Sequence, residues 1–298
     1  MAVESTEYTQ STYDRVADGY DELWSRHVVQ PNERLTRELR LARGERLADL
    51  ACGTGLYTVE MARRVAPGQV VAVDYSERML AAARDRAAGE GLSLSLVHAK
   101  AEDFVAIAES ESFDVISCRF ALAYVDWREV LPRMGRLLRR GGRVGLLTSV
   151  NRSTPQFLEL FDRYRRSFGT AWSLYRHAGG SFAKAFRLYH QMRGIFGDGH
   201  FIVVPDDIES AAERLAAGGL TVRDTWTDRI RLWFESGEAA VAWIRDSGYA
   251  THPSLARVDR EGLRFLAALF AAGMETFREP RGVPVDLVIG GVIAERRH

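Results

Sequence analysis

The sequence predicts an α/β fold in which a mostly parallel, doubly wound sheet of seven strands is covered by helices on both faces. Three observations predict it. Short apolar segments alternate with amphipathic segments between Arg46 and Val150. The apolar segments carry few polar residues, as expected for parallel strands that are buried on both faces. The first strand is followed at once by a glycine-containing turn and a helix.

Composition limits the classes of protein that the chain can be. It has 298 residues, of which 46% are hydrophobic and 27% charged, and its 40 basic residues balance 40 acidic ones. This balance disfavours a nucleic-acid partner, and no apolar run approaches the ~20 residues that span a bilayer. Two cysteines, Cys52 and Cys118, are too few for a disulfide framework or a zinc cluster. We expect a cytoplasmic protein without bound metal or a membrane partner; its oligomeric state is left open.

The N-terminal segment, residues 1–44, is predicted to be helical. Its small and aromatic residues recur at helical spacing, which predicts one inward-facing side: Tyr13, Ala17, Tyr20 and Trp24. The pattern predicts two helices between about Thr6 and Leu41, with a break near Val29–Pro31.

Residues 45–150 form the predicted core of the fold. The expected strands are Leu47–Leu50, Val70–Val73, Leu92–Val97, Phe113–Cys118 and Arg143–Val150. Ser76 is predicted to cap the helix that follows the second strand. A further amphipathic helix is expected over Trp127–Arg140, ended by Gly141 and Gly142.

The remaining residues are predicted to add a helical cap and to complete the sheet. Residues 151–205 have no strand signal and carry two aromatic stripes: Phe157, Phe161, Tyr164 and Phe168, then Phe182, Phe186 and His190. Residues 206–298 predict a helix at 206–217, a strand or hairpin at 220–234, helices near 238–245 and 261–275, and a closing strand at 285–294. We expect a single domain over residues 1–298.

The turn after the first strand predicts a ligand site. Gly53 and Gly55 let the backbone turn sharply and approach a ligand closely. Such a crevice at the carboxyl end of a strand is where open α/β sheets bind cofactors. Asp74 ends the next strand, where its carboxylate can accept hydrogen bonds from a ribose diol.

The same segment disfavours a pyrophosphate. A dinucleotide turn needs a third small residue for close packing of helix and strand, and Thr58 occupies that position. Asp49 lies just before the turn, where its charge would repel phosphate but suit an ammonium group or a hydroxyl. These features favour a cofactor with an amino-acid tail over NAD.

With these motifs the chain resembles the class I S-adenosylmethionine-dependent methyltransferases, which have a Rossmann-like fold. The likeness is to the small-molecule enzymes related to those of ubiquinone and menaquinone biosynthesis. The matching segments are DLACGTG at 49–55, VVAVDYSERML at 70–80, AKAEDF at 99–104, SFDVISCRFALAYV at 112–125 and LLRRGGRVGLL at 137–147. The resemblance therefore covers about residues 8–150.

The resemblance implies a role for each matching residue. Gly53 and Gly55 would line the methionine moiety of the cofactor, which Asp49 would orient. Asp74 would hold the ribose hydroxyls. The adenine would be contacted by Tyr75, Met79, Ala101 and Glu102. The backbone at Cys118 would meet the methionine amino group, and Tyr13 and Tyr20 would belong to a helix that closes over the cofactor.

Two positions depart from the family pattern. Ala51 stands where the family usually has glycine, a change that we expect to be harmless. Lys100 stands where an acid often reads the adenine amino group, which shifts that contact to backbone groups and Glu102.

The predicted activity is methyl transfer to a small, largely apolar organic acceptor. The donor is already activated, so the protein's main task is to align the reactants and exclude water. We expect residues 151–205 and the N-terminal helix to cover the acceptor. Candidates for handling a proton are Tyr124, His190 and His177, and for each a structural role is the alternative.

Other functions are compatible with parts of the sequence. A protein that binds S-adenosylmethionine without methylating, for cyclisation or regulation, would share the fold. An NAD-dependent oxidoreductase would share the sheet and the ribose-binding acid. A nucleic-acid methyltransferase is disfavoured by the balanced charge.

Overall fold

The computed structural model describes residues 2–150, 153–164, 166, 204–248, 255 and 258–297. Its described residues form one seven-stranded sheet in the order β3-β2-β1-β4-β5-β7-β6. The strands are β1 (Arg46–Leu50), β2 (Gln69–Asp74), β3 (Ser95–His98), β4 (Phe113–Arg119), β5 (Leu138–Ser149), β6 (Leu220–Phe234) and β7 (Val283–Arg296). Strands β1 to β5 pair in parallel, whereas β7 runs antiparallel to β5. The predicted doubly wound, mostly parallel sheet is confirmed.

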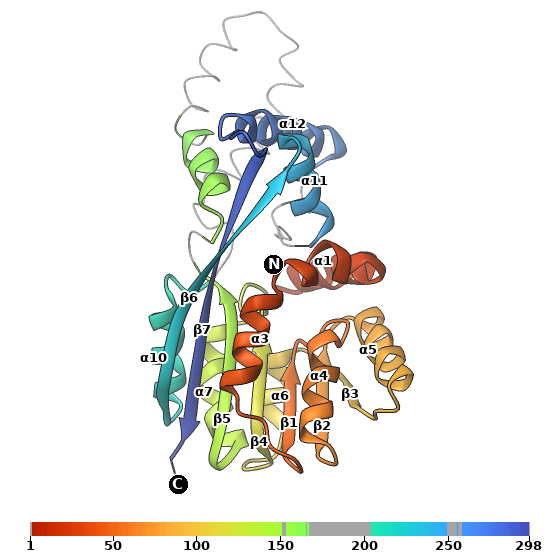
Figure 1. The fold of residues 1–298 in the computed structure, drawn as a ribbon, viewed down its shortest axis with the longest axis vertical. Coiled ribbons are helices and arrows are strands. Elements are labelled where there is room, and N and C mark those ends of the chain that lie inside the picture. The colour runs from red at the N-terminus through yellow and green to blue at the C-terminus, as the bar shows by residue number, and fades with distance from the viewer. Residues whose placement is uncertain are drawn as a thin grey trace, which may run out of the picture. The chain divides into compact units, whose positions relative to one another are not determined.

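Helices cover both faces of the sheet (Figure 1). One face carries α3 (Val29–Glu38), α4 (Leu56–Val65) and α5 (Glu77–Gly89), and the other carries α6 (Ala101–Ile107), α7 (Trp127–Leu137) and α10 (Ile208–Ala217). Helix α3 lies directly on β5, because a Cβ at Gly145 would come within 3.0 Å of the Leu35 and Leu39 side chains. Both faces of the central strands are therefore closed to water.

The N-terminal segment contains more breaks than the sequence predicts. The break near Val29–Pro31 is confirmed, because α3 begins at Val29 with Pro31 in its first turn. The single helix predicted before it is wrong. That stretch is divided into α1 (Ala2–Val16), the 3-10 turn η1 (Ala17–Gly19), α2 (Tyr20–Leu23) and the 3-10 turn η2 (Ser25–His27). Gly19, a poor helix former, lies at the junction of η1 and α2.

Helix α5 shows how local signals set the boundaries of the elements. Its N-cap is Ser76, as predicted, and the Ser76 Oγ accepts a hydrogen bond from the backbone N–H of Met79 at 3.1 Å. At its C-terminus the N–H of Leu92 donates to the Ala87 carbonyl, with Gly91 in the left-handed region. This cap uses Leu92, so β3 begins at Ser95, three residues after the predicted start.

Helix α7 ends earlier than the sequence predicts. It stops at Leu137, and β5 begins at Leu138, which pairs with Phe113 of β4. The expected helix through Arg140 is therefore wrong. Gly141 and Gly142 do not stop the helix; they allow an irregularity inside β5 between the pairs Phe113–Leu138 and Val115–Arg143. Pairing with β4 thus overrides the helical periodicity of this segment.

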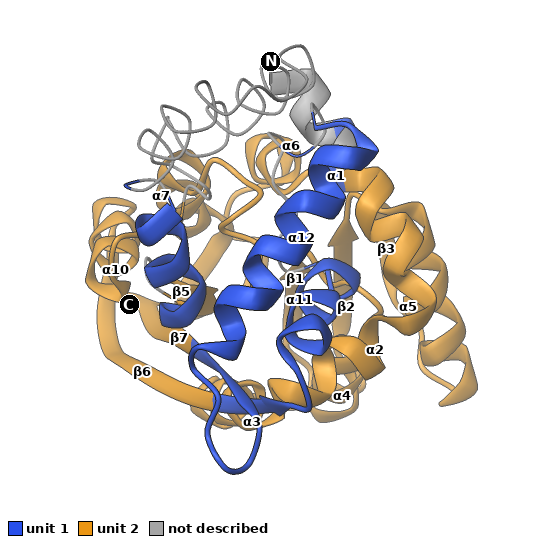
Figure 2. Ribbon diagram, turned by 90° about the horizontal axis from the view of Figure 1, so that it is seen from above, with its two compact units in different colours: residues 1–9, 154–202, 231–287 blue, residues 10–153, 203–230, 288–298 orange. Residues whose placement is uncertain are grey.

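Strands β6 and β7 complete the sheet. Residues 220–234 form one strand rather than the alternative hairpin. Contacts divide the chain into two compact units (Figure 2). Unit 1 comprises residues 1–9, 154–202 and 231–287, and unit 2 comprises residues 10–153, 203–230 and 288–298. A single domain over residues 1–298 stays a prediction.

Unit 1 has an apolar core of its own. Residues 155–164 are helical, and Phe161 is buried with Leu266 of α12 (Arg260–Glu275). The Phe157 and Phe270 rings stack at 6.0 Å. Helix α11 (Gly237–Asp246) also belongs to this unit. Phe168 and the second predicted stripe, Phe182, Phe186 and His190, lie outside the described residues.

Within the part of the chain that the structure describes, no helix combines the length and the apolar composition needed to cross a membrane.

Candidate active site

The glycine bend lies where the strand order reverses, between β1 and β4. Gly53 and Gly55 have φ values of 57° and 75°, in the left-handed region that glycine tolerates. A Cβ on Gly55 would lie 2.7 Å from the Cβ of Ala83, so glycine is required there for α4 to approach α5. A Cβ on Gly53 would meet no atom within 4 Å. The bend therefore presents bare backbone toward open space, which fits a ligand held against it.

Asp74 fixes the bend from the end of β2. Its two oxygens accept hydrogen bonds from the backbone N–H of Gly53 at 2.8 Å and of Ser76 at 2.9 Å. A carboxylate has about four acceptor positions, so Asp74 can also accept a hydrogen bond from a ribose hydroxyl. Burial raises the pKa of Asp74, and the backbone N–H groups of Ser76, Gly53 and Tyr75 partly oppose this shift. The role of Asp74 toward the ribose stays a prediction.

Ala51, which stands where the family usually has glycine, has a strained backbone. Its φ is 56°, so it holds a left-handed conformation at the start of the bend. In that conformation the Cβ of an L-residue crowds the following carbonyl oxygen, which costs about 1–2 kcal/mol. The expectation that this replacement of glycine is harmless stays a prediction.

Asp49 belongs to a buried ion pair that the sequence analysis missed. It is 3% exposed and accepts a hydrogen bond from the Thr58 hydroxyl at 2.5 Å. The Arg119 guanidinium lies 3.5 Å away. Arg119 also donates to Ser117 and to Thr36, and its Nε is buried without a partner. One signal in the sequence could have indicated this ion pair: Arg119 directly follows the apolar strand predicted at 113–118.

The pKa shifts of this pair have one physical cause. Burial raises the pKa of Asp49 and lowers the pKa of Arg119, because both charged forms lose their hydration. Each partner opposes the shift of the other. The negative charge that was expected to face the cofactor's ammonium group is therefore largely compensated from within the protein.

The predicted adenine contacts surround the tip of β2. The Tyr75 ring stacks on His98 at 5.8 Å, and the Lys100 ammonium lies 5.4 Å from the ring centroid. The carboxylate of Glu102 accepts a hydrogen bond from the Asp126 backbone N–H at 2.8 Å. Ala101 is buried at the start of α6. The sequence did not predict the contact of Lys100 with Tyr75 or that of Glu102 with Asp126.

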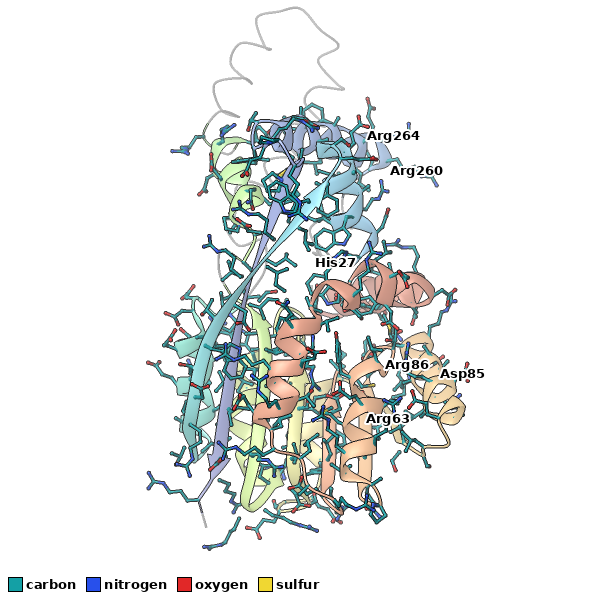
Figure 3. All side chains as sticks on the ribbon, viewed as in Figure 1. His27, Arg63, Asp85, Arg86, Arg260 and Arg264 are labelled. Atoms are coloured by element: carbon teal, nitrogen blue, oxygen red, sulfur yellow. The ribbon has the colours of Figure 1, made fainter. Side chains whose placement is uncertain are left out.

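Acidic residues of the N-terminal segment hold it against the bend and α5. Asp14 accepts a hydrogen bond from the Ser76 hydroxyl at 2.5 Å, and Asp18 pairs with Arg78 at 2.6 Å. Asp21 accepts from Thr54 of the bend at 2.7 Å and pairs with Arg86 of α5, a residue labelled in Figure 3. These contacts hold the segment beside the glycine bend and α5, and its closure over the cofactor stays a prediction.

Tyrosines gather beside the same site. Tyr13 and Tyr20 pack with Met79 in one apolar cluster. The Tyr13 ring lies 6.0 Å from Tyr20 and 5.4 Å from Tyr124, with which it shares a side-chain hydrogen bond. Burial, followed by the neighbouring Tyr124, raises the pKa of Tyr13 and of Tyr20 well above its usual value. Both phenols are therefore protonated at neutral pH and can donate hydrogen bonds.

The other predicted residues divide into two groups. Cys118 is fully buried in β4, next to Leu50 of β1, and burial raises its pKa to about 12. Its thiol is thus unreactive, as expected of a core cysteine. His177 and His190 lie outside the described residues. Of the three candidates for handling a proton, only Tyr124 is placed.

A doubly wound sheet with a glycine bend and a terminal acid at its switch point defines a nucleotide-type cofactor-binding protein. Residues 47–142 match the family described as "Methyltransferase domain". Over this segment the chain is similar to class I S-adenosylmethionine-dependent methyltransferases, and S-adenosylmethionine is the cofactor that this likeness implies.

Particular relatives agree with this class. The demethylmenaquinone methyltransferase of Staphylococcus aureus is 28% identical over 165 residues, which are 53% of this chain and 67% of that protein. A structure described as a proposed methyltransferase of Bacillus halodurans is 17% identical, with a TM-score of 0.55 over 90% of this chain and 99% of its own. The [4+2]-cyclase SpnF is also 17% identical, with a TM-score of 0.50 over 90% and 80%. These structures share the fold.

Proposed function

We propose that the protein transfers the methyl group of S-adenosylmethionine to a small, largely apolar organic acceptor. One observation carries the proposal: the bend at Gly53, the Asp74 carboxylate and the Tyr13–Tyr124 pair belong to one compact unit and gather at the tips of β1, β2 and β4. A cofactor held by the first two would present its reactive end near the tyrosines.

The residues at this edge can hold each part of the cofactor. The backbone of Gly53 leaves room for the methionine moiety, and the free acceptor positions of Asp74 suit the ribose hydroxyls. Tyr75, which stacks on His98, and the buried Met79 would contact the adenine. The Asp49 carboxylate is paired with Arg119, so it does not offer an uncompensated negative charge to the cofactor.

Methyl transfer from this cofactor requires little acid–base catalysis by these residues. When bound, S-adenosylmethionine supplies a methyl group that is already activated on a sulfonium. Tyr13 and Tyr20 stay protonated, because burial raises the pKa of each. They can therefore donate hydrogen bonds that orient an acceptor, and with Trp24 they contribute apolar surface that excludes water. Tyr124 is hydrogen-bonded to Tyr13 and is our candidate for contact with the acceptor's polar group.

A protein that binds the cofactor but performs a cyclisation is the second candidate, because the [4+2]-cyclase SpnF shares the fold. Measuring S-adenosylhomocysteine formation with candidate acceptors separates the two. Stoichiometric S-adenosylhomocysteine and methylated acceptor support methyl transfer. Conversion of an acceptor without S-adenosylhomocysteine would favour the cyclase.

Asp74→Asn tests the cofactor site itself. An amide accepts at one oxygen and cannot hold both backbone N–H groups and a diol, so S-adenosylhomocysteine should bind about 10–100-fold more weakly. The matched control is Asp85→Asn, an exposed residue of α5 (Figure 3), which should leave binding unchanged. Calorimetric titration measures both variants. Equal affinities in the wild type and Asp74→Asn would contradict the proposed role.

The same titration has a predicted pH dependence. The ribose hydroxyls donate to the ionised Asp74, and burial raises the pKa of this group. Affinity should therefore be full at neutral pH and fall as the pH drops toward about 4, beginning above the range of an ordinary aspartate. Asp74→Asn should reduce this dependence. If the affinity of the wild type rose as the pH fell, the predicted direction of the pH dependence would be wrong.

A further inference from the structure

Two carboxylates place negative charge beside the glycine bend. Asp49 is the penultimate residue of β1, is 3% exposed and pairs in register with Ala72, two residues before Asp74. Burial is the main cause of the raised pKa values of Asp74 and of the Cys52 thiol, and the charge of Asp49 adds to both shifts. The field of Asp49 therefore reaches the bend, where the amino-acid end of the cofactor is expected.

Arg119 supplies a positive charge that faces Asp49. Its Nη1 lies 3.5 Å from a carboxylate oxygen of Asp49. The same guanidinium donates to Thr36 of α3 at 3.2 Å and to Ser117 of β4, and it lies 5.7 Å from the centroid of the Tyr57 ring of α4. Three elements thus hold the cation against the carboxylate.

The backbone that follows Arg119 is also held in place. Phe120 has a φ of 56°, in the left-handed region that a bulky residue seldom adopts. Its N–H donates to the Leu147 carbonyl at 2.8 Å, and its ring packs edge-to-face against the buried Trp24, with centroids 5.4 Å apart. The end of β4 is therefore fixed, which limits the positions that the Arg119 side chain can take.

Stability does not account for an arginine at this position. Arg119 is 8% exposed, burial lowers its pKa, and its Nε is a buried donor without a partner among the described residues. A buried ion pair contributes little net stability, because the loss of hydration offsets the attraction, and apolar replacements are often neutral or stabilising. The contribution that an apolar side chain could not make is the positive charge that compensates Asp49 beside the bend.

We propose that Arg119 is a positioning residue for the cofactor: acting through Asp49, it makes the site select a zwitterionic amino-acid end over a purely cationic one. The inference rests on the proposed binding of S-adenosylmethionine and names the charge that its tail must carry. An uncompensated Asp49 would attract an ammonium group and repel a neighbouring carboxylate, whereas the compensated pair does neither strongly. These forces are larger in a buried site than in bulk water.

The test compares two ligands of the full-length protein: S-adenosylhomocysteine and its decarboxylated counterpart, whose tail carries only the ammonium group. Calorimetric titration at about pH 8, where carboxylates are ionised, gives the ratio of their affinities. The wild type should bind S-adenosylhomocysteine at least about tenfold more tightly. Arg119→Met and Arg119→Gln remove the charge and should shift the ratio at least about tenfold toward the decarboxylated ligand. Arg119→Lys keeps the charge and should stay within about threefold of the wild-type ratio.

The ratio separates this role from a purely structural one. Loss of packing would weaken the binding of both ligands alike and leave the ratio unchanged, even where a variant melts at a lower temperature. The matched control is Arg46→Met. Arg46 begins β1 at the end away from the bend, and its Nε is likewise buried without a partner in the described part of the chain. This control should keep the wild-type ratio.

Three results would overturn the inference: a wild type that prefers the decarboxylated ligand, an unchanged ratio in a folded uncharged variant of Arg119, or an equal shift in Arg119→Lys or Arg46→Met. Failure of the wild type to bind S-adenosylhomocysteine would instead contradict the proposed function.

Discussion

At the scale of single residues, Ala51 and Asp49 show how the site departs from a simple motif. The left-handed Ala51 bears a backbone cost at the entrance of the bend. Asp49 and Arg119 have side chains only 4% and 7% exposed, and burying two charges is offset by their mutual attraction only in part. Thr58, Ser117 and Thr36 supply the extra hydrogen bonds that make such a pair tolerable.

The strain at Ala51 leads to a prediction about stability. Ala51→Gly should raise the free energy of unfolding by about 0.5–1 kcal/mol, because the relieved strain exceeds the larger chain entropy of glycine. The control is Ala82→Gly in the middle of α5, which should lower it by about 1 kcal/mol. Urea denaturation measures both. A loss of stability in Ala51→Gly would refute the strain argument.

At the scale of elements, the N-terminal segment and α5 act together around the bend. Arg86 pairs with Asp21, and its Nε donates to the Thr54 carbonyl at 3.1 Å, so one side chain joins three parts of the fold. Arg78 and Asp18 form a second pair whose side chains are 53% and 82% exposed. Exposed pairs contribute little, so Arg86 should be the main polar connection.

We therefore expect Arg86→Gln to release S-adenosylhomocysteine about tenfold faster and to lose about 1–2 kcal/mol of stability. The N-terminal segment would then separate more readily from the bend. Arg78→Gln is the matched control and should cost less than about 1 kcal/mol with little change in release. Stopped-flow dissociation measures the rates. Equal rates in the two variants would argue against the role assigned to Arg86.

At the scale of the whole molecule, the chain forms two compact units with different interiors. Unit 2 contains the sheet core and the predicted cofactor residues. Unit 1 contains an aromatic cluster and a buried polar network centred on Asp286, which is 3% exposed. Arg231 donates to both oxygens of Asp286 at 2.7 and 2.9 Å, and Gln156 donates at 3.0 Å.

Removing the centre of this network should weaken unit 1. Asp286→Ala leaves the buried Gln156 without its acceptor, which should cost about 2–3 kcal/mol and speed amide hydrogen exchange in α11 and α12. Affinity for S-adenosylhomocysteine should persist, because its predicted contacts belong to unit 2. The control, Asp246→Ala, breaks an exposed pair with Arg245 and should cost less than about 1 kcal/mol. Unchanged exchange in Asp286→Ala would contradict a stabilising role.

Much of the fold could be predicted because its signals are local. Apolar strands, the Ser76 cap and the spacing of Gly53 and Gly55 each act within a few residues. The errors arose where a neighbour in space decided the outcome. Leu138 is extended because it pairs with Phe113, and residues 92–94 leave β3 because Leu92 caps α5.

The sequence by itself determined the sheet, the glycine bend, the acid that follows it and hence the likeness to S-adenosylmethionine-dependent methyltransferases. Only the tertiary structure decided which carboxylate keeps free acceptor positions. Asp74 accepts hydrogen bonds from backbone N–H groups and keeps acceptor capacity, whereas the charge of Asp49 is compensated by Arg119, 70 residues away. The left-handed turn at Phe120 likewise depends on Leu147 and Trp24. Pairing between distant residues leaves no periodic signal along the chain, so only the folded molecule reveals it.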